Sequence, residues 1–305
     1  GHEVHLLLKE KYLAEAQQGY VLYHLNQDKK RQYPLIFKNF QCHSDWTTVA
    51  AAKVDQVWLC MSTTALAQMD LQPLAQAIGE ATVMVLQPSP EQIERVKRTV
   101  GASRVTAGMI NMISYHAPLL TETVPQPGVA FWIPPLAPMA VEGDRQRADI
   151  IVQMLKQAKI PASYQDNFAK KSAHASAFLM TALAVLEAND WQFTRFSADK
   201  TGLQTMRIAQ QEAYAALAAE YGVQPPLALQ CIRSWMIPAI LFAARHVAPL
   251  DMETYLQAHF SKVRSQTVML LQSYVQLAQQ QQLPYSALSA LLSGMGEATV
   301  ASDAV

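Results

Sequence analysis

The sequence is poor in cysteine, and this scarcity limits the kind of protein it can be. Three cysteines occur among 305 residues, Cys42, Cys60 and Cys231, and none of them forms a C-x-x-C pair. Such usage argues against a disulfide framework and against a zinc site, and it fits a reducing compartment. We therefore expect a cytoplasmic protein.

Net charge and long apolar runs are also lacking. The 24 basic residues balance the 24 acidic ones, so no electrostatic footprint for nucleic acid or an anionic membrane is present. The longest apolar run, residues 235–244, is interrupted by Pro238 and has about half the length of a membrane-spanning helix. It predicts a buried helix, and the expected partners are small molecules or a second copy of the chain.

Several catalytic signatures are missing as well. The sequence has no H-E-x-x-H, no G-x-S-x-G and no P-loop, which disfavours metal hydrolysis and phosphoryl transfer. His2 and His5 are three residues apart in a predicted strand, so their side chains point to opposite faces and cannot share a metal ion. We expect no metal site.

The first half of the chain alternates β-rich runs with helical stretches, as an α/β domain does. Residues 21–25 and 33–37 predict a hairpin, and the apolar runs 57–61 and 82–86 predict strands buried on both faces of a parallel sheet. Helices are expected at 70–78, 91–100 and 143–159, further strands at 104–110 and 128–133, and a linker at 161–167. This alternation of strands and helices before the linker predicts an α/β Rossmann-like domain over residues 1–162.

After Phe168 the apolar period changes from two to 3.6 residues, which predicts an all-α domain over residues 163–305. Three apolar stripes are expected to form its core. They comprise Ala175, Phe178, Leu179, Ala182 and Leu186; Met206, Ala209, Ala213, Leu217 and Tyr221; and Val263, Thr267, Leu270, Tyr274 and Leu277.

Residues 1–9, Gly-His-Glu-Val followed by apolar residues and Lys9, predict the second strand of a dinucleotide-binding fold. In such folds a first strand and a G-x-G-x-x-G turn precede that strand and hold the pyrophosphate. The 305 residues contain no such turn. The first strand and first helix of the fold are accordingly absent from this sequence.

The order of these segments resembles the ketopantoate reductase (2-dehydropantoate 2-reductase) family. The matching segments are residues 1–9, 54–61, 86–108, 212–222 and 256–284. The resemblance implies an NADPH-dependent reduction of a branched 2-oxo acid, ketopantoate to pantoate in pantothenate biosynthesis. It also implies a lysine and a glutamate from the helical domain in the reaction, and a possible homodimer.

On the nucleotide side, the resemblance implies four cofactor-binding positions: Lys9, Ser62, Gln87 and Pro88. Lys9 ends the opening strand, where the family has a basic residue for the 2′-phosphate, so NADP is the expected cofactor. Ser62 replaces a family lysine, and Gln87-Pro88-Ser89 replaces the family's Gln-Asn-Gly turn. An ordinary solvated lysine is the competing interpretation of Lys9.

On the substrate side, the resemblance places the catalytic acid at Lys170, two residues after Phe168. An ammonium there could protonate the alkoxide that forms as hydride arrives. His174 and Phe178 stand four and eight residues later, where the family has substrate-binding asparagines. Lys171 is the competing lysine, and its helical face is expected to lie closer to the core.

In the last long helix, the resemblance places Thr254 at a substrate-binding serine and Gln266 at the family's catalytic glutamate. A register slip would place Thr267 there instead of Gln266. Glutamine keeps the shape of glutamate but cannot carry its charge. Three functions therefore remain open: a ketopantoate reductase, a reductase of a different 2-oxo acid or related carbonyl compound, and a non-catalytic family member acting as a dimeric ligand-binding or scaffold protein.

Overall fold

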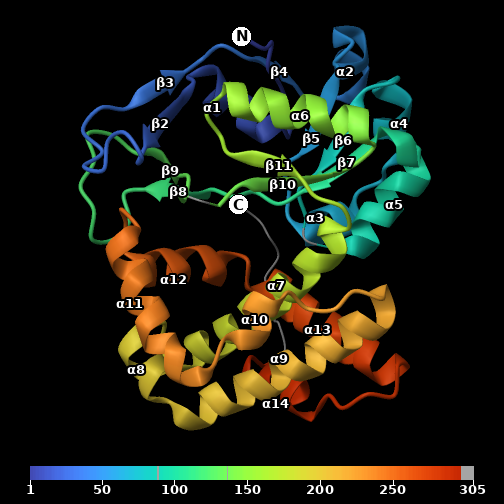
Figure 1. The fold of residues 1–305 in the computed structure, drawn as a ribbon. Helices are drawn as coiled ribbons and strands as arrows, with labels where there is room; N and C mark the ends of the chain where they lie inside the picture. Colours follow the sequence, from blue (N-terminus) through green and yellow to red (C-terminus); the bar gives the residue numbers. More distant parts are fainter. Residues whose placement is uncertain (88, 136, 297–305) are drawn as a thin grey trace. The chain divides into compact units, whose positions relative to one another are not determined.

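The structure is a computed structural model that describes residues 1–87, 89–135 and 137–296. The chain divides into two compact units, Gly1–Phe168 and Ala169–Val305. The first unit is α/β and the second is helical (Figure 1). This confirms the predicted fold class, a Rossmann-like unit followed by an all-α unit.

The strands of the first unit belong to three sheets. They are β1 (His5–Leu7), β2 (Tyr20–His24), β3 (Leu35–Phe37), β4 (Gln41–His43), β5 (Gln56–Leu59), β6 (Thr82–Val85), β7 (Val105–Gly108), β8 (Ile113–Ala117), β9 (Gly128–Trp132), β10 (Met139–Gly143) and β11 (Ala162–Tyr164). Its helices are α1 (Leu13–Gln17), α2 (Trp46–Ala52), α3 (Thr63–Gln68), α4 (Gln72–Ala77), α5 (Pro90–Val100) and α6 (Arg145–Gln157).

The largest sheet has the strand order β11-β10-β7-β6-β5. Strands β5, β6 and β7 are parallel, whereas β10 runs antiparallel to β7. Every residue of β6 and β7 is buried, which is why these runs are apolar without alternation. Gly108 is needed where β7 meets β10, because a Cβ there would lie 2.6 Å from the Ala140 carbonyl oxygen.

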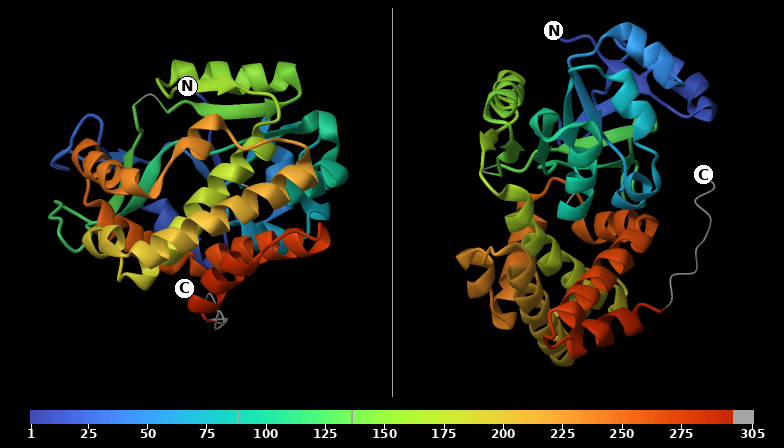
Figure 2. Two further views of the ribbon diagram at one scale, coloured as in Figure 1. Left: turned by 60° about the horizontal axis from the view of Figure 1, so that its bottom comes forward. Right: turned by 90° about the vertical axis from the view of Figure 1, so that its right-hand side faces the viewer.

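Helices cover both faces of this sheet, α6 on one face and α5 on the other (Figures 1 and 2). Each begins where the sequence provides a cap: the Ser89 side chain accepts from Gln92 N, and the Asp144 side chain accepts from Arg147 N. Helix α5 ends at Gly101, which has φ 98°. The predicted helices 91–100 and 143–159 are thus confirmed with boundaries shifted by one or two residues.

Two smaller sheets complete the first unit. Strands β1 and β4 form a parallel pair, and β3-β2-β9-β8 form a four-stranded sheet that contains the predicted hairpin as β2 and β3. The opening strand β1 therefore pairs with β4 and is not part of the five-stranded sheet. The predicted linker 161–167 is wrong in part, since β11 lies within it and pairs with β10.

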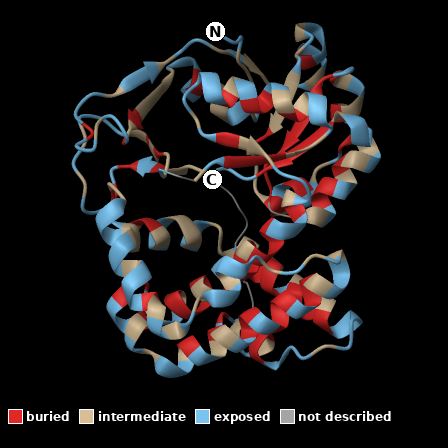
Figure 3. Cartoon of the chain, viewed as in Figure 1, coloured by how far each residue is buried: buried red, intermediate tan, exposed pale blue. Residues whose placement is uncertain are grey.

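The second unit is built of helices α7 (Phe168–Ala188), α8 (Phe193–Ala198), α9 (Lys200–Tyr221), α10 (Leu227–Cys231), α11 (Ile237–Val247), α12 (Met252–Lys262), α13 (Arg264–Gln280) and α14 (Ser286–Gly294). Its core lies mainly between α7, α9, α13 and α14 (Figure 3). Most of the predicted stripe on α9 is buried, and so are Thr267, Leu270 and Tyr274 of the α13 stripe.

Three expectations about these helices are wrong. Helix α7 is buried over most of its surface, so its core is not confined to one stripe, and Leu179 is 40% exposed. Helix α11 is largely exposed: Ile237 is buried, but Trp235 just before the helix is 78% exposed and Phe242 is 65% exposed. The predicted long last helix is interrupted at Val263, between α12 and α13. Among the described residues, no helix is long and apolar enough to cross a membrane.

Candidate functional site

The carboxyl ends of β5 and β6 carry two of the predicted nucleotide-binding residues. Ser62 follows β5 and caps α3, since its Oγ accepts from Ala65 N at 3.1 Å. Gln87 follows β6 and is 3% exposed. Its Nε2 donates to the carbonyl oxygens of Leu59 and Met61, both at 2.7 Å. Gln87 therefore ties the end of β6 to the end of β5.

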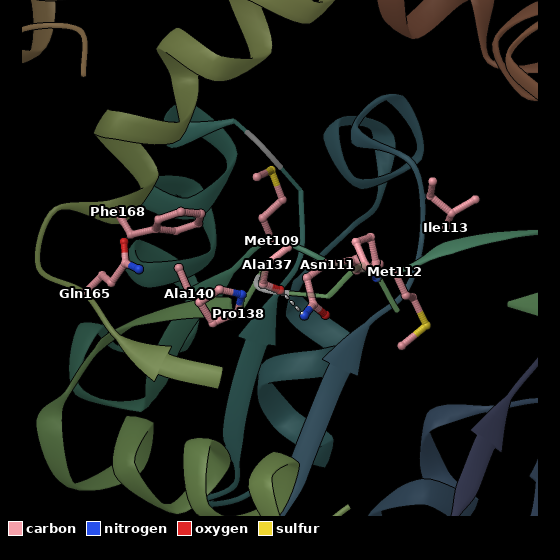
Figure 4. Close-up of a pocket in the computed structure, with 11 residues that line it drawn as sticks. Met109, Asn111, Met112, Ile113, Ala137, Pro138, Ala140, Gln165 and Phe168 are labelled. Atoms are coloured by element: carbon pink, nitrogen blue, oxygen red, sulfur yellow. Dashed lines mark hydrogen bonds between the residues drawn. The ribbon is translucent and has the colours of Figure 1, made fainter. Parts of the chain in front are cut away.

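A pocket opens next to this edge, at the carboxyl end of β7. It has a volume of about 420 Å³ and lies entirely within the first unit. Its lining comes from the segment after β7, the segment before β10 and the chain after β11 (Figure 4). The lining residues are Met109, Ile110, Asn111, Met112, Ile113, Pro134, Ala137, Pro138, Ala140, Gln165 and Phe168.

Two lining side chains carry amides, and both are engaged. Asn111 Nδ2 donates to the Ala137 carbonyl oxygen at 2.6 Å, a bond drawn in Figure 4, and to the Pro161 carbonyl oxygen at 3.4 Å. Gln165 Nε2 donates to Ser163 Oγ at 3.3 Å. The Asn111 bonds fasten the segment after β7 to the segments beside β10 and β11, so they shape the wall of the pocket.

Lys9 lies just beyond β1, at the start of a short 3-10 helix, Glu10–Tyr12. Its side chain is exposed, as a cation must be to meet a phosphate from solution. The structure therefore leaves Lys9 accessible, and its proposed role toward a 2′-phosphate stays a prediction. Pro88, the remaining nucleotide-side candidate, lies outside the described residues.

The substrate-side candidates Lys170, His174 and Phe178 all lie on α7. Lys170 is exposed in the first turn, and so is Lys171. We expected Lys171 to lie closer to the core than Lys170, but both lysines are exposed. Ala175, one turn after Lys171, is only half-buried, and the buried His174 shares a helix face with both lysines. Phe178 is half-buried against the core of the helical unit.

His174 is completely buried, and neither ring nitrogen has a hydrogen-bond partner among the described residues. Its ring packs against Tyr214 of α9, with 5.7 Å between the ring centroids. Burial lowers the pKa of His174, although the backbone of Lys170, Lys171 and Tyr214 acts in the opposite direction. In this environment the imidazole is neutral at pH 7, and contact with a ligand would require the ring to move.

The same buried region contains two polar groups that the sequence reasoning missed. Tyr214 Oη and Gln210 Nε2 are buried without a hydrogen-bond partner in the described part of the chain, and burial raises the pKa of Tyr214 to about 12. The two residues are one helical turn apart on α9. A signal was present in the sequence, since polar residues sit beside Ala209 and Ala213 of the predicted core stripe.

Thr254 and Gln266 lie on different helices, α12 and α13. The Thr254 hydroxyl donates to Asp251 Oδ2 at 3.0 Å, so this residue is part of the N-terminal cap of α12. Gln266 is half-buried in the first turn of α13. The break at Val263 means that helical periodicity does not place the two side chains on one face, and their functional roles stay predictions.

The pocket residues themselves were not predicted from the sequence. Met109, Ile110 and Met112 follow a buried strand directly, and Met109 and Ile110 remain 37% and 48% exposed. Apolar side chains left exposed after a parallel strand are the signal that could have identified them, because ligands of open α/β sheets bind at that edge. No group of three or more metal-ligating side chains occurs among the residues that the structure describes.

The fold of the chain is similar to that of solved ketopantoate reductases. The chain is similar to a ketopantoate reductase from Ralstonia eutropha, with a TM-score of 0.69, 20% identity, and coverage of 97% of this chain and 90% of that one. It is also similar to the 2-dehydropantoate 2-reductase from Geobacter metallireducens, with a TM-score of 0.67, 14% identity, and coverage of 98% and 93%.

A third similar structure is a D-mandelate dehydrogenase in a ternary complex with NADH and anilino(oxo)acetate. The TM-score is 0.68 at 13% identity, with coverage of 97% of this chain and 90% of the dehydrogenase. No protein-family model and no curated protein sequence matches the chain. These likenesses confirm the resemblance in fold, and at such identities they establish the fold alone.

The described residues fit a dinucleotide in part. The parallel strands present the edge at which such cofactors bind, and Lys9 is accessible for a phosphate. The polar groups of Gln87 and Ser62, however, are already engaged with the protein backbone. The pyrophosphate has no Gly-rich turn to hold it within these 305 residues, so we assign no contact to it.

Proposed function

We propose that the protein is an NAD(P)H-dependent reductase of 2-oxo acids or related carbonyl compounds. The observation that carries this proposal is the apolar pocket at the carboxyl end of β7, in a chain with the fold of such reductases. The nicotinamide cofactor would supply the hydride. NADP is favoured over NAD because Lys9 offers a cation at the end of β1.

Within this proposal, Lys170 is the general acid. Its ammonium is exposed at the start of α7, so it can reach a ligand without desolvation of a buried charge. It would donate a proton to the oxygen that becomes a hydroxyl. Thr254, Phe178 and His174 are the proposed substrate-side neighbours, and Gln266 would offer its amide to the substrate where the related reductases use a carboxylate.

The test compares two adjacent lysines. Oxidation of NADPH and NADH is followed with a panel of 2-oxo acids that includes ketopantoate, using the protein and its Lys170→Ala and Lys171→Ala variants. We expect Lys170→Ala to lower kcat by at least about 100-fold while nucleotide affinity is retained. Lys171→Ala should stay close to the parent protein.

Two results would contradict the proposal. One is the absence of saturable nucleotide binding by either cofactor, measured by fluorescence quenching. The other is equal turnover by the parent protein and Lys170→Ala. Saturable binding without turnover on any acid would instead support the second candidate, a non-catalytic ligand-binding protein, which the neutral Gln266 and the apolar Phe178 favour.

Reduction of ketopantoate in pantothenate biosynthesis is the narrower form of the first candidate. We also propose that the protein forms a homodimer and is located in the cytoplasm. The dimer can be tested by sedimentation equilibrium, because an assembly of two chains has twice the monomer mass of 33.8 kDa.

A further inference from the structure

None of the described residues that line the pocket after β7 carries a charged side chain. Nine of its eleven lining residues are apolar, and the other two are Asn111 and Gln165. A volume of about 420 Å³ falls within the range of small-molecule sites, roughly 300–1,000 Å³. The wall is therefore suited to an apolar group of substantial size, and it offers nothing that could neutralise a carboxylate.

The amide of Asn111 is turned toward the protein backbone. Its Nδ2 donates to the Ala137 carbonyl oxygen at 2.6 Å and lies 3.4 Å from the Pro161 carbonyl oxygen. Its Oδ1 is buried from solvent and has no partner among the described residues, so the side chain would have to turn before this oxygen met a ligand. The other polar side chain of the lining, Gln165, is exposed and lies where a ligand could contact it.

The apolar side chains can also adapt to their occupant. Met109 and Met112 are unbranched and polarizable, so they fit differently shaped apolar groups. Ile110 and Met109 are 48% and 37% exposed, and covering them with an apolar group would remove that surface from water, at a gain of about 25 cal/mol per Å².

We propose that this pocket holds the side chain of the substrate and that it selects 2-oxo acids with a bulky, purely apolar side chain, branched or aromatic, over those with a hydroxylated one. That the substrate is a 2-oxo acid rests on the proposed reductase function. The preference for an apolar side chain on that acid rests on the residues that line the pocket. The carboxylate and the oxo group would lie outside this pocket.

A matched pair of acids tests the selection. Ketopantoate and 3,3-dimethyl-2-oxobutanoate differ by one hydroxyl, which the pocket would leave unpaired. An apolar pocket discriminates against an added hydroxyl by roughly 10- to 100-fold. We expect 3,3-dimethyl-2-oxobutanoate and phenylglyoxylate to bind at least about tenfold more tightly than ketopantoate, with kcat/KM in the same order.

Binding is read independently of turnover from the methyl resonances of methionine labelled with ¹³C, in the full chain with saturating NADPH. Met109→Leu and Met112→Leu assign the two pocket signals, and Met206, which is 2% exposed in the helical unit, serves as the internal reference. The apolar acids should shift the Met109 and Met112 signals and leave Met206 unchanged.

A charge placed in the pocket provides the second test. Ile110→Lys changes an exposed lining residue and should weaken binding of the apolar acids by more than about tenfold without altering the thermal midpoint. Leu120→Lys is the matched control, because Leu120 is 95% exposed in the same unit and does not line the pocket.

The outcomes separate the two proposals. Tighter binding or faster reduction of ketopantoate than of its deoxy analogue overturns the selection and leaves the reductase function standing. Methyl shifts without nucleotide oxidation overturn the reductase function and leave the pocket assignment standing. If no acid shifts Met109 or Met112, the pocket does not hold the side chain and the inference is wrong.

Discussion

His174 shows how one buried residue can make a helical unit sensitive to acid. The ring is fully buried, faces Tyr214 of α9 and follows Lys170 and Lys171 by one turn. Burial lowers its pKa from the usual 6.5. The unfolded chain therefore takes up the proton more readily than the folded chain does.

We expect the helical unit to be fully stable above about pH 6.5 and to lose stability as the pH falls below it, by at most about 1.4 kcal/mol per pH unit. Hydrogen exchange of α7 and α9, corrected for the intrinsic rate, measures this between pH 7.5 and 5. His174→Leu should reduce the dependence, and the remainder should come from His259 of α12, whose pKa burial also lowers. The exposed His116→Gln should keep the full dependence. An unchanged pH profile in His174→Leu would refute the role of this residue.

The site residues mark the limit of what sequence reasoning could predict at this scale. Lys9 and Lys170 are exposed, and the roles that the resemblance implies for them stay predictions. The sequence gives no indication, however, that Gln87 uses its amide to bridge two strand ends or that Thr254 caps a helix. Those bonds depend on which backbone groups lie within reach, and residue spacing does not carry that information.

At the scale of elements, a buried ion pair fastens two segments of the four-stranded sheet. Arg31, after β2, contacts Glu122, after β8, at 2.7 Å, with side chains 10% and 8% exposed. Tyr115 of β8 donates to Glu122 Oε1 at 2.7 Å and accepts from Arg31. Burial raises the pKa of Tyr115, so its hydroxyl stays protonated at physiological pH.

Glu122→Ala should lower the free energy of unfolding by about 3–5 kcal/mol, because it removes the carboxylate that balances the buried charge of Arg31. The exposed pair of Arg145 and Asp149 provides the comparison, and Asp149→Ala should cost at most about 1 kcal/mol. Urea denaturation followed by circular dichroism measures both. If the two variants lost similar amounts of unfolding free energy, the buried ion pair would not stabilise the protein more than the exposed pair does.

A second carboxylate acts between helices. Glu212 of α9 is buried, and its two oxygens accept from Leu288 N at 2.9 Å, Ala287 N at 3.2 Å and Ser286 Oγ at 3.3 Å. It thereby satisfies donors at the start of α14. Glu212→Leu should destabilise the unit by roughly 1–3 kcal/mol and speed hydrogen exchange in α14 first.

Glu220→Leu is the control for that experiment. Glu220 lies on the same helix and is exposed, where its Oε2 accepts from Gln281. Its replacement should leave exchange in α14 unchanged. Faster exchange that is uniform over the whole unit in Glu212→Leu would mean that the carboxylate supports the core in general and has no particular role at α14.

Strong local signals made some elements predictable. Helix α5 begins after the Ser89 cap with Pro90 in its first turn, and it ends at Gly101, as the helix predicted at 91–100 required. Strand β11 was missed because it has three residues and follows Pro161. Helix α11 was expected to be buried because it is apolar, but hydropathy reports what a side chain favours and not what lies next to it.

At the scale of the whole molecule, the change in apolar period predicts domains at residues 1–162 and 163–305. The structure divides into the compact units Gly1–Phe168 and Ala169–Val305, and the domain boundaries stay a prediction. What could not be predicted is the division of the first unit into three sheets. Strand pairing depends on contacts between distant residues, and an apolar run looks the same whichever strand it pairs with.

That division has a consequence for how these 305 residues behave in solution. Strand β1 pairs on one side with β4, and β5 ends the five-stranded sheet, so each has an unpaired edge within the described chain. Such an edge presents a row of free donors and acceptors that another polypeptide can extend. Residues 56–59 of β5 include valine, tryptophan and leucine and carry no charge. Strand β5 therefore offers an edge at which another polypeptide can add a strand.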